Sequence, residues 1–202
     1  MAYPTVSAPY GLKPVNLIGG QVFAGATRLM EIASGYATNI FYGDLVKRVS
    51  TGTIELDNGT ATATPCGVFL GVQFTNGSTG QVQQQQFYPA SQSIKSGTKI
   101  FAVVADDPDT LFQVVSCSAT TTVAGMGIAA IGSNIALIQN AGSSTTGNSA
   151  VAIDEGTQTT TNTLPIRIID VVRDTATGFD TFVEFIVKIN ATMHQYNNST
   201  GI

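Results

Sequence analysis

The sequence has no tryptophan, a single histidine and two cysteines. A Ser-His-Asp triad would have to use His194, and a zinc site needs several His and Cys ligands at fixed spacing, so neither is expected. Sites that handle glycans usually offer aromatic platforms, and the missing tryptophan weakens that interpretation. Enzyme motifs are also missing, because no Gly-x-Ser-x-Gly elbow, P-loop or dinucleotide-binding glycine pattern occurs. We therefore expect no enzyme, no catalytic residue, no cofactor and no metal.

Charged residues are scarce as well, at 11% of the chain, against a usual share of about 25%. The nine Lys and Arg residues are scattered, and the only adjacent pair is Lys47-Arg48, so direct nucleic-acid binding is not expected. The densest acidic run, Asp106-Asp107-Pro108-Asp109, does not match a calcium-loop pattern and is typical of a polar turn between strands. Whether this run binds a cation stays open.

Long apolar runs are missing too, and none approaches the roughly 20 residues that span a bilayer. The polar start of the chain, Met1–Thr5, lacks a secretory leader pattern, so we expect synthesis in the cytoplasm and no membrane partner. In that compartment Cys66 and Cys117 are expected to be small, buried and reduced, although a sequence alone does not show whether they pair.

What the chain does contain is 43% hydrophobic residues, with Thr, Ser, Gly, Asn and Gln in place of charge. Interface cores are depleted in charged residues, so this composition suits a surface that partners cover. The alternative is a slightly acidic soluble protein that is rich in Thr.

Short apolar runs bounded by turn residues recur about every ten positions, which is typical of a β-sandwich or β-barrel. We therefore predict an all-β, mainly antiparallel fold. The last two runs are predicted to form a long antiparallel hairpin. The predicted strands are residues 29–33, 40–42, 45–49, 53–56, 67–74, 99–104, 111–115, 165–172 and 182–189.

The remaining stretches are predicted to be an arm and loops. Pro4, Pro9 and Pro14 punctuate residues 1–25, which indicates an extended N-terminal arm before a single β-rich domain at 26–202. Residues 81–92 and 141–163 read as loops. The second is a Ser/Thr/Gly-rich insertion in which Val151–Ile153 could form an exposed strand. Residues 123–139 contain three glycines and predict a short helix or turn.

Four segments of the sequence together carry a resemblance to a known family: Ala8–Val15 (APYGLKPV), Ile32–Val46 (IASGYATNIFYGDLV), Gly67–Val72 (GVFLGV) and Asp106–Val114 (DDPDTLFQV). In these segments the chain resembles small virion proteins of tailed bacteriophages, a group that includes head decoration (cement) proteins. The resemblance spans residues 8–115 and carries no catalytic motif.

The resemblance implies a capsid decoration protein that binds the outer surface of the major capsid protein shell and stabilises it. It implies the capsid exterior of the virion as the location, and self-association as a trimer or dimer. Arms of such proteins reach across to neighbouring subunits, and an extended arm can add a strand to an exposed sheet edge. We therefore expect apolar residues of the arm to contact the capsid: Tyr10, Leu12, Val15, Leu17 and Ile18.

Three alternatives remain open on the sequence. A tail or head-fibre component should show repeats or heptads, and none occurs. A carbohydrate-binding module or depolymerase would need exposed aromatics in a groove or a carboxylate pair. A head-completion or connector protein usually has helices around a pore.

Overall fold

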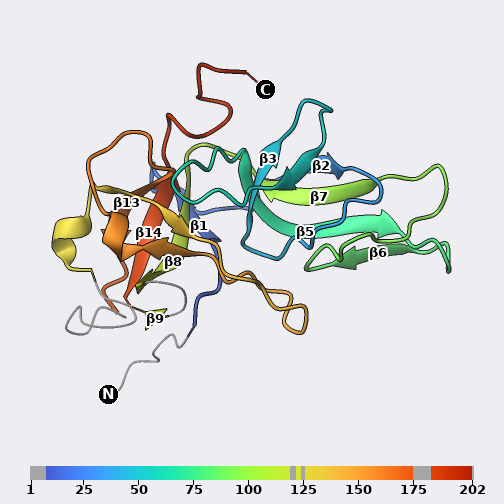
Figure 1. Cartoon of the computed structure of the whole chain (residues 1–202), viewed down its shortest axis with the longest axis horizontal. Coiled ribbons are helices and arrows are strands. Elements are labelled where there is room, and N and C mark those ends of the chain that lie inside the picture. The colour runs from blue at the N-terminus through green and yellow to red at the C-terminus, as the bar shows by residue number, and fades with distance from the viewer. Residues whose placement is uncertain (1–7, 119–121, 124–125, 175–182, 202) are drawn as a thin grey trace.

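The computed structural model describes residues 8–201 apart from 119–121, 124–125 and 175–182, and these residues are almost entirely β-structure in two sheets (Figure 1). The all-β prediction is therefore confirmed. No helix within the described ranges is long and apolar enough to cross a bilayer. The elements are β1 (Lys13–Leu17), β2 (Arg28–Ile32), β3 (Leu45–Arg48), β4 (Ile54–Leu56), β5 (Gly67–Thr75), β6 (Val82–Gln85), β7 (Ile100–Ala105), β8 (Thr110–Ser118), β9 (Thr122–Val123), η1 (Ile128–Ala130), β10 (Asn134–Ile135), β11 (Leu137–Ile138), β12 (Ala152–Asp154), η2 (Glu155–Thr157), β13 (Ile166–Val171) and β14 (Glu184–Ile189).

The first sheet closes on itself like a small barrel. Its order is β3-β4-β2-β7-β5, and β3 also pairs with β5, which completes the ring and leaves β6 attached outside it on β5. Gly71 lies where the β5–β7 register shifts, and its φ of 152° suits this irregularity. Inward-facing residues of these strands, among them Phe69 and Phe74, form one buried cluster with Tyr88, which follows β6. Each such side chain contributes roughly 1.5–3 kcal/mol through burial.

The second sheet is organised around β8, the strand with the most partners. The first half of β8 lies between β1 and β14, and its second half pairs with β9 and, in parallel, with β12. β13 and β14 form the antiparallel pair that the sequence predicted, with a register shift between Ile168 and Asp170. The connection between them lies largely outside the described residues.

A shared core joins the two sheets side by side (Figure 1). The cluster of the second sheet contains Phe112 and Phe185, and it also takes in Leu45, Val68 and Ala105 from the barrel strands. The described chain therefore has continuous apolar packing from one sheet to the other.

Most predicted strands are present, and three expectations need correction. Residues 81–92 are not all loop, because β6 pairs with β5 from Val82 to Gln85. The strand near Val151–Ile153 exists but is buried rather than exposed, because β8 and β11 flank it. Residues 40–42 form only isolated bridges, from Ile40 to Tyr88 and from Tyr42 to Asn148, rather than a strand. The short helix or turn predicted within 123–139 is present as η1, together with the short strands β10 and β11. Cys66 and Cys117 are buried and unpaired, as expected.

Candidate interaction surface

The N-terminal segment lies against its own sheets rather than extending away. Gly11 and Leu12 donate backbone hydrogen bonds to Val151 and Gly43, at 3.1 and 2.9 Å, and β1 then runs antiparallel to β8. Gly11 has a φ of 80°, and a Cβ there would lie 2.6 Å from Ser149 Cβ, so only glycine fits this approach. The described part of the expected arm is therefore an ordered strand of the chain's own fold.

The five predicted contact residues separate into buried and exposed groups. Leu12 is fully buried in the shared core, so in this conformation it does not reach a partner. The Tyr10 hydroxyl donates to the Glu184 carboxylate, and the ammonium of Lys13 lies 4.1 Å from the centre of the Tyr10 ring. Burial, and then the Glu184 carboxylate, raise the pKa of Tyr10 above its ordinary value. Leu12 and Tyr10 therefore attach the N-terminal segment to the sheets and are not available to a partner.

The apolar side chains that do reach solvent follow β1. Val15 and Leu17 are half-buried, whereas Ile18 is 50% exposed and Val22 is 74% exposed. Val22 was not among the predicted contacts. The Gly19-Gly20 pair before it signals a tight turn, and a residue just beyond such a turn is poorly placed for burial.

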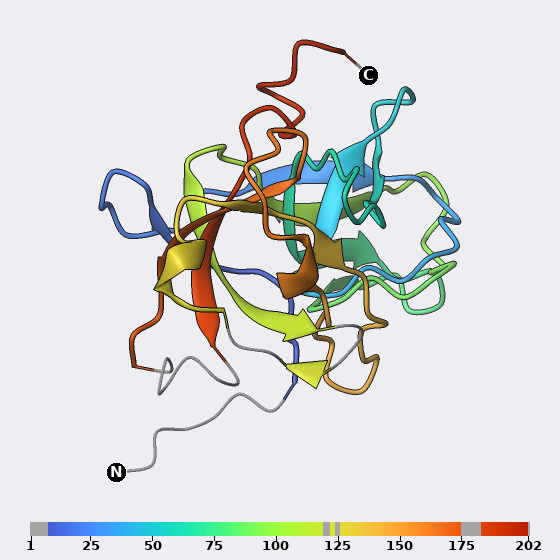
Figure 2. The ribbon, with the colours of Figure 1, turned by 60° about the vertical axis from the view of Figure 1, so that its left-hand side comes forward.

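Residues 16–23 form a tight projecting loop, called here the 16–23 loop, which stands out as the blue loop in Figure 2. Leu17 donates to the Gln21 carbonyl at 2.8 Å, Gly20 donates to the Leu17 carbonyl at 2.9 Å, and Asn16 bridges Val22. At its base Phe23 packs against the shared core. The loop is thus cross-linked by its own backbone and presents Ile18 and Val22 at its surface.

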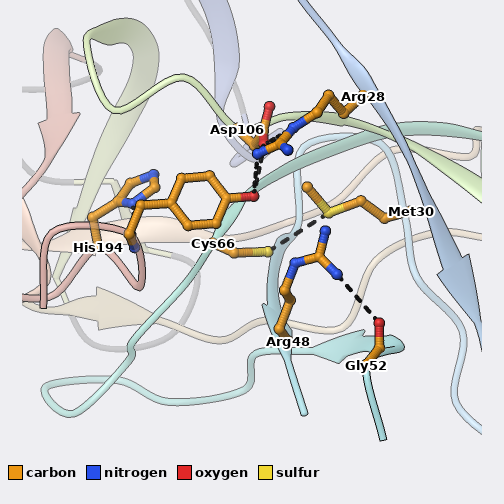
Figure 3. Close-up of polar contacts among 8 residues, drawn as sticks. Arg28, Met30, Arg48, Gly52, Cys66, Asp106 and His194 are labelled. Atoms are coloured by element: carbon orange, nitrogen blue, oxygen red, sulfur yellow. Dashed lines mark hydrogen bonds and ion pairs between the residues drawn. The ribbon is translucent and has the colours of Figure 1, made fainter. Parts of the chain in front are cut away.

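At the other end of the chain, a polar cluster fastens the C-terminal segment to the barrel (Figure 3). Asp106, buried at the end of β7, accepts from Arg28 Nε at 2.6 Å and from the Tyr196 hydroxyl at 2.7 Å. Arg28 also donates to the Tyr196 hydroxyl at 2.8 Å, and burial together with Asp106 raises the pKa of Tyr196 to about 12. The expected polar turn at 106–109 is present, but its first carboxylate is an anchor rather than a solvated group.

Two neighbours of Tyr196 complete this cluster. Gln195 exchanges two hydrogen bonds with the backbone of Arg48, at 2.7 and 3.1 Å, as a neighbouring strand would. His194 is buried, with its Nδ1 accepting from the Tyr196 amide at 3.2 Å and its Nε2 without a partner. Burial lowers the pKa of His194, so it is neutral at neutral pH. Its role is to pack the segment against the body of the protein.

Metal binding and thiol chemistry depend on the acidic, histidine and cysteine side chains. No three His, Cys, Asp or Glu side chains within the described ranges are grouped so as to hold a metal ion. Burial raises the pKa of the Cys66 thiol to about 12 and that of Cys117 to about 11, which keeps both unreactive at neutral pH.

No protein-family model, curated protein or solved structure matched the chain when it was compared with each.

Proposed function

We propose that this protein is a bacteriophage virion structural protein, a capsid decoration protein that binds the outer surface of the major capsid protein shell. The observation that carries the proposal is the 16–23 loop, which holds Ile18 and Val22 in solvent on a rigid base. The resemblance of residues 8–115 to phage head proteins supplies the kind of partner. The scarcity of charge fits a surface that neighbours cover.

The proposed contact set is smaller than the set predicted from the sequence. Ile18 remains from the predicted five, and Val22 joins it, because both are exposed and lie on one turn. An apolar side chain that passes fully from water into a partner's pocket contributes roughly 1.5–3 kcal/mol. Such a contact is weak alone, but it becomes effective when copies joined in an oligomer bind neighbouring sites at once, because the linkage makes the later contacts intramolecular.

Cement action then follows from mass action. A protein that binds the assembled shell, and not the separated subunits, stabilises the assembled state by its binding free energy. Because each loop is pre-ordered by its own hydrogen bonds, little conformational entropy is lost when it docks.

The test is co-sedimentation of the purified chain with shells of the phage that encodes it, after the shells have been stripped of this protein. The wild-type chain is expected to sediment with the shells, and Ile18→Ser is expected to weaken binding at least tenfold. Ile128→Ser is the matched control, because Ile128 is 49% exposed in η1 and the chemical change is identical.

Equal binding by the two serine variants would contradict the assignment of the 16–23 loop. A wild-type chain that stays in the supernatant at every concentration would contradict the decoration function itself. A glycan array with the same protein would then test the carbohydrate-binding alternative.

A further inference from the structure

The β6 strand is an open edge of the barrel sheet. Within the described ranges it pairs with β5 alone, from Val82 to Gln85, and Figure 1 shows it along the lower margin of that sheet. In an antiparallel edge strand, alternate residues direct their N–H and C=O groups away from the one partner. β6 therefore presents backbone donors and acceptors to the outside, beside a Val82 side chain that is 64% exposed.

The other described edges are protected in ways that β6 is not. β1 carries Lys13 and Pro14, has a register irregularity, and is covered by the bridge from Asn16 to Val22. β9, β10 and β11 are two residues long. Charged side chains, proline, irregularities and short length are the usual means by which proteins prevent edge-to-edge pairing. β6 has no proline, no charge and a regular register.

The surroundings of β6 are uncharged over a long stretch of sequence. Residues 58–94 contain no Asp, Glu, Lys, Arg or His, and they include β5, β6 and both flanks of β6. Two copies of a chain with a net charge of −4 repel each other in general, but these stretches meet without like charges in contact. A charged partner strand would gain no ion pair there, so charge favours a neutral strand, and the β6 of a second copy is one.

We propose that β6 pairs with β6 of a second copy, antiparallel about a two-fold axis, so that the two barrel sheets continue into each other. A two-fold contact places the same surface on both sides, and antiparallel pairing of identical neutral strands meets that requirement. With Gln84 on the two-fold axis, Gln84 lies opposite its own copy and Gln83 lies opposite Gln85, and glutamine amides both donate and accept. This inference concerns the isolated chain and does not depend on the proposed capsid binding.

The contact is small. Four residues per strand bury less area than the 1,200–2,000 Å² that is typical of stable complexes. We therefore expect a weak dimer in solution. Its Kd should be about 10⁻⁴ M, which lies between micromolar and millimolar affinity.

The decisive experiment places a cysteine at the centre of the edge. Gln84 is exposed in β6, and directly paired residues of antiparallel strands lie about 4.5–5.5 Å apart at Cα, within disulfide range. Under a glutathione redox buffer, Gln84→Cys is expected to form a covalent dimer at least tenfold faster than Ser78→Cys. Ser78 lies in the neighbouring uncharged turn and is equally exposed, but its two copies would be on the order of 30 Å apart.

A second pair of variants tests the non-covalent dimer by sedimentation equilibrium up to about 1 mM. Gln84→Lys adds an edge charge and is expected to raise the dimer Kd at least tenfold, whereas Ser78→Lys adds the same charge beside the edge with little effect. Equal cross-linking rates for Gln84→Cys and Ser78→Cys would overturn the proposal. So would a wild-type chain that remains monomeric at every concentration.

Discussion

The N-terminal segment, residues 8–23, and the C-terminal segment, residues 190–201, both lie against the sheets, but different chemistry holds them. Backbone pairing and the buried Leu12 hold most of the first segment, with one side-chain hydrogen bond from Tyr10 to Glu184. Side-chain hydrogen bonds hold the second, through Gln195 to Arg48 and through Tyr196 to Asp106. The polar segment is fastened through its named side chains, whereas the apolar segment leaves Ile18 and Val22 exposed. The comparison teaches that the N-terminal segment keeps two apolar side chains in solvent after it is fixed, which is why the proposed contact lies there.

The largest expected effect breaks the attachment of the N-terminal segment. Leu12→Ala leaves a cavity in the shared core, and we expect it to lower the free energy of unfolding by about 2–5 kcal/mol. Urea denaturation measures this change. Ile18→Ala, on the same segment, is expected to change stability by less than about 0.5 kcal/mol, because that side chain is largely in water. Similar losses for both variants would contradict the division into anchoring and presenting residues.

The next effect breaks the C-terminal attachment. Asp106→Asn removes the charge that Arg28 and Tyr196 share, and hydrogen bonds to a charged group contribute about 1.5–3 kcal/mol. We expect a loss of about 1–3 kcal/mol in urea denaturation, since Arg28 is largely exposed and water screens part of the attraction. Asp109→Asn makes the same chemical change at a more exposed carboxylate, which is paired with the half-buried Lys188, and it should cost less than about 1 kcal/mol.

A smaller effect appears with pH. Burial lowers the pKa of His194 in the folded protein, whereas the unfolded residue titrates near 6.5. Below about pH 6.5 the unfolded chain therefore binds more protons at this position, so stability is lost as the pH falls toward the lowered pKa. We expect the stability difference between wild type and His194→Gln to change in this window and to stay constant above pH 7.

This pH series needs the variant because other groups act with the opposite sign. Burial raises the pKa of Asp44 and of Asp57, so their contributions to stability increase as the pH falls. Asp44 and Asp57 are present in both wild type and His194→Gln, so their contributions cancel when the two unfolding free energies are subtracted. A difference that is flat from pH 7.5 to 5 would show that His194 is not held neutral.

The smallest expected effect on stability belongs to the proposed contact residues themselves. The double variant Ile18→Ser, Val22→Ser changes two exposed side chains and should shift the unfolding free energy by less than about 1 kcal/mol. Thermal and urea unfolding check this value. A large loss would mean that the 16–23 loop stabilises the fold, and its exposed side chains would then be poor evidence for a partner.

The strands could be predicted wherever one face is apolar. Residues 67–74 and 99–104 become β5 and β7 because buried strands concentrate Val, Phe and Ile. β6 was missed because glutamines on both faces hide the alternation. β12 was anticipated near Val151–Ile153, but its burial was not, because the polar sequence around it gives no sign of the strands that flank it. Such strands are specified by their neighbours rather than by their own residues.

The candidate surface could be predicted only in part, for a related reason. The apolar residues of the first 25 positions were visible in the sequence, but which of them the fold buries depends on contacts far along the chain. The Leu12 amide donates to the Gly43 carbonyl, and the Tyr10 hydroxyl donates to the Glu184 carboxylate. The burial of His194 and the pairing of Arg28 with Asp106 likewise join residues with no local pattern to reveal them.

Cryo-electron microscopy of the virion that carries this chain, with icosahedral averaging, tests the central claim most directly. The account predicts ordered density for the two sheets on the outer face of the shell in many copies, with the 16–23 loop against the shell. Density confined to the tail or to one vertex, or a 16–23 loop that faces solvent, would contradict it.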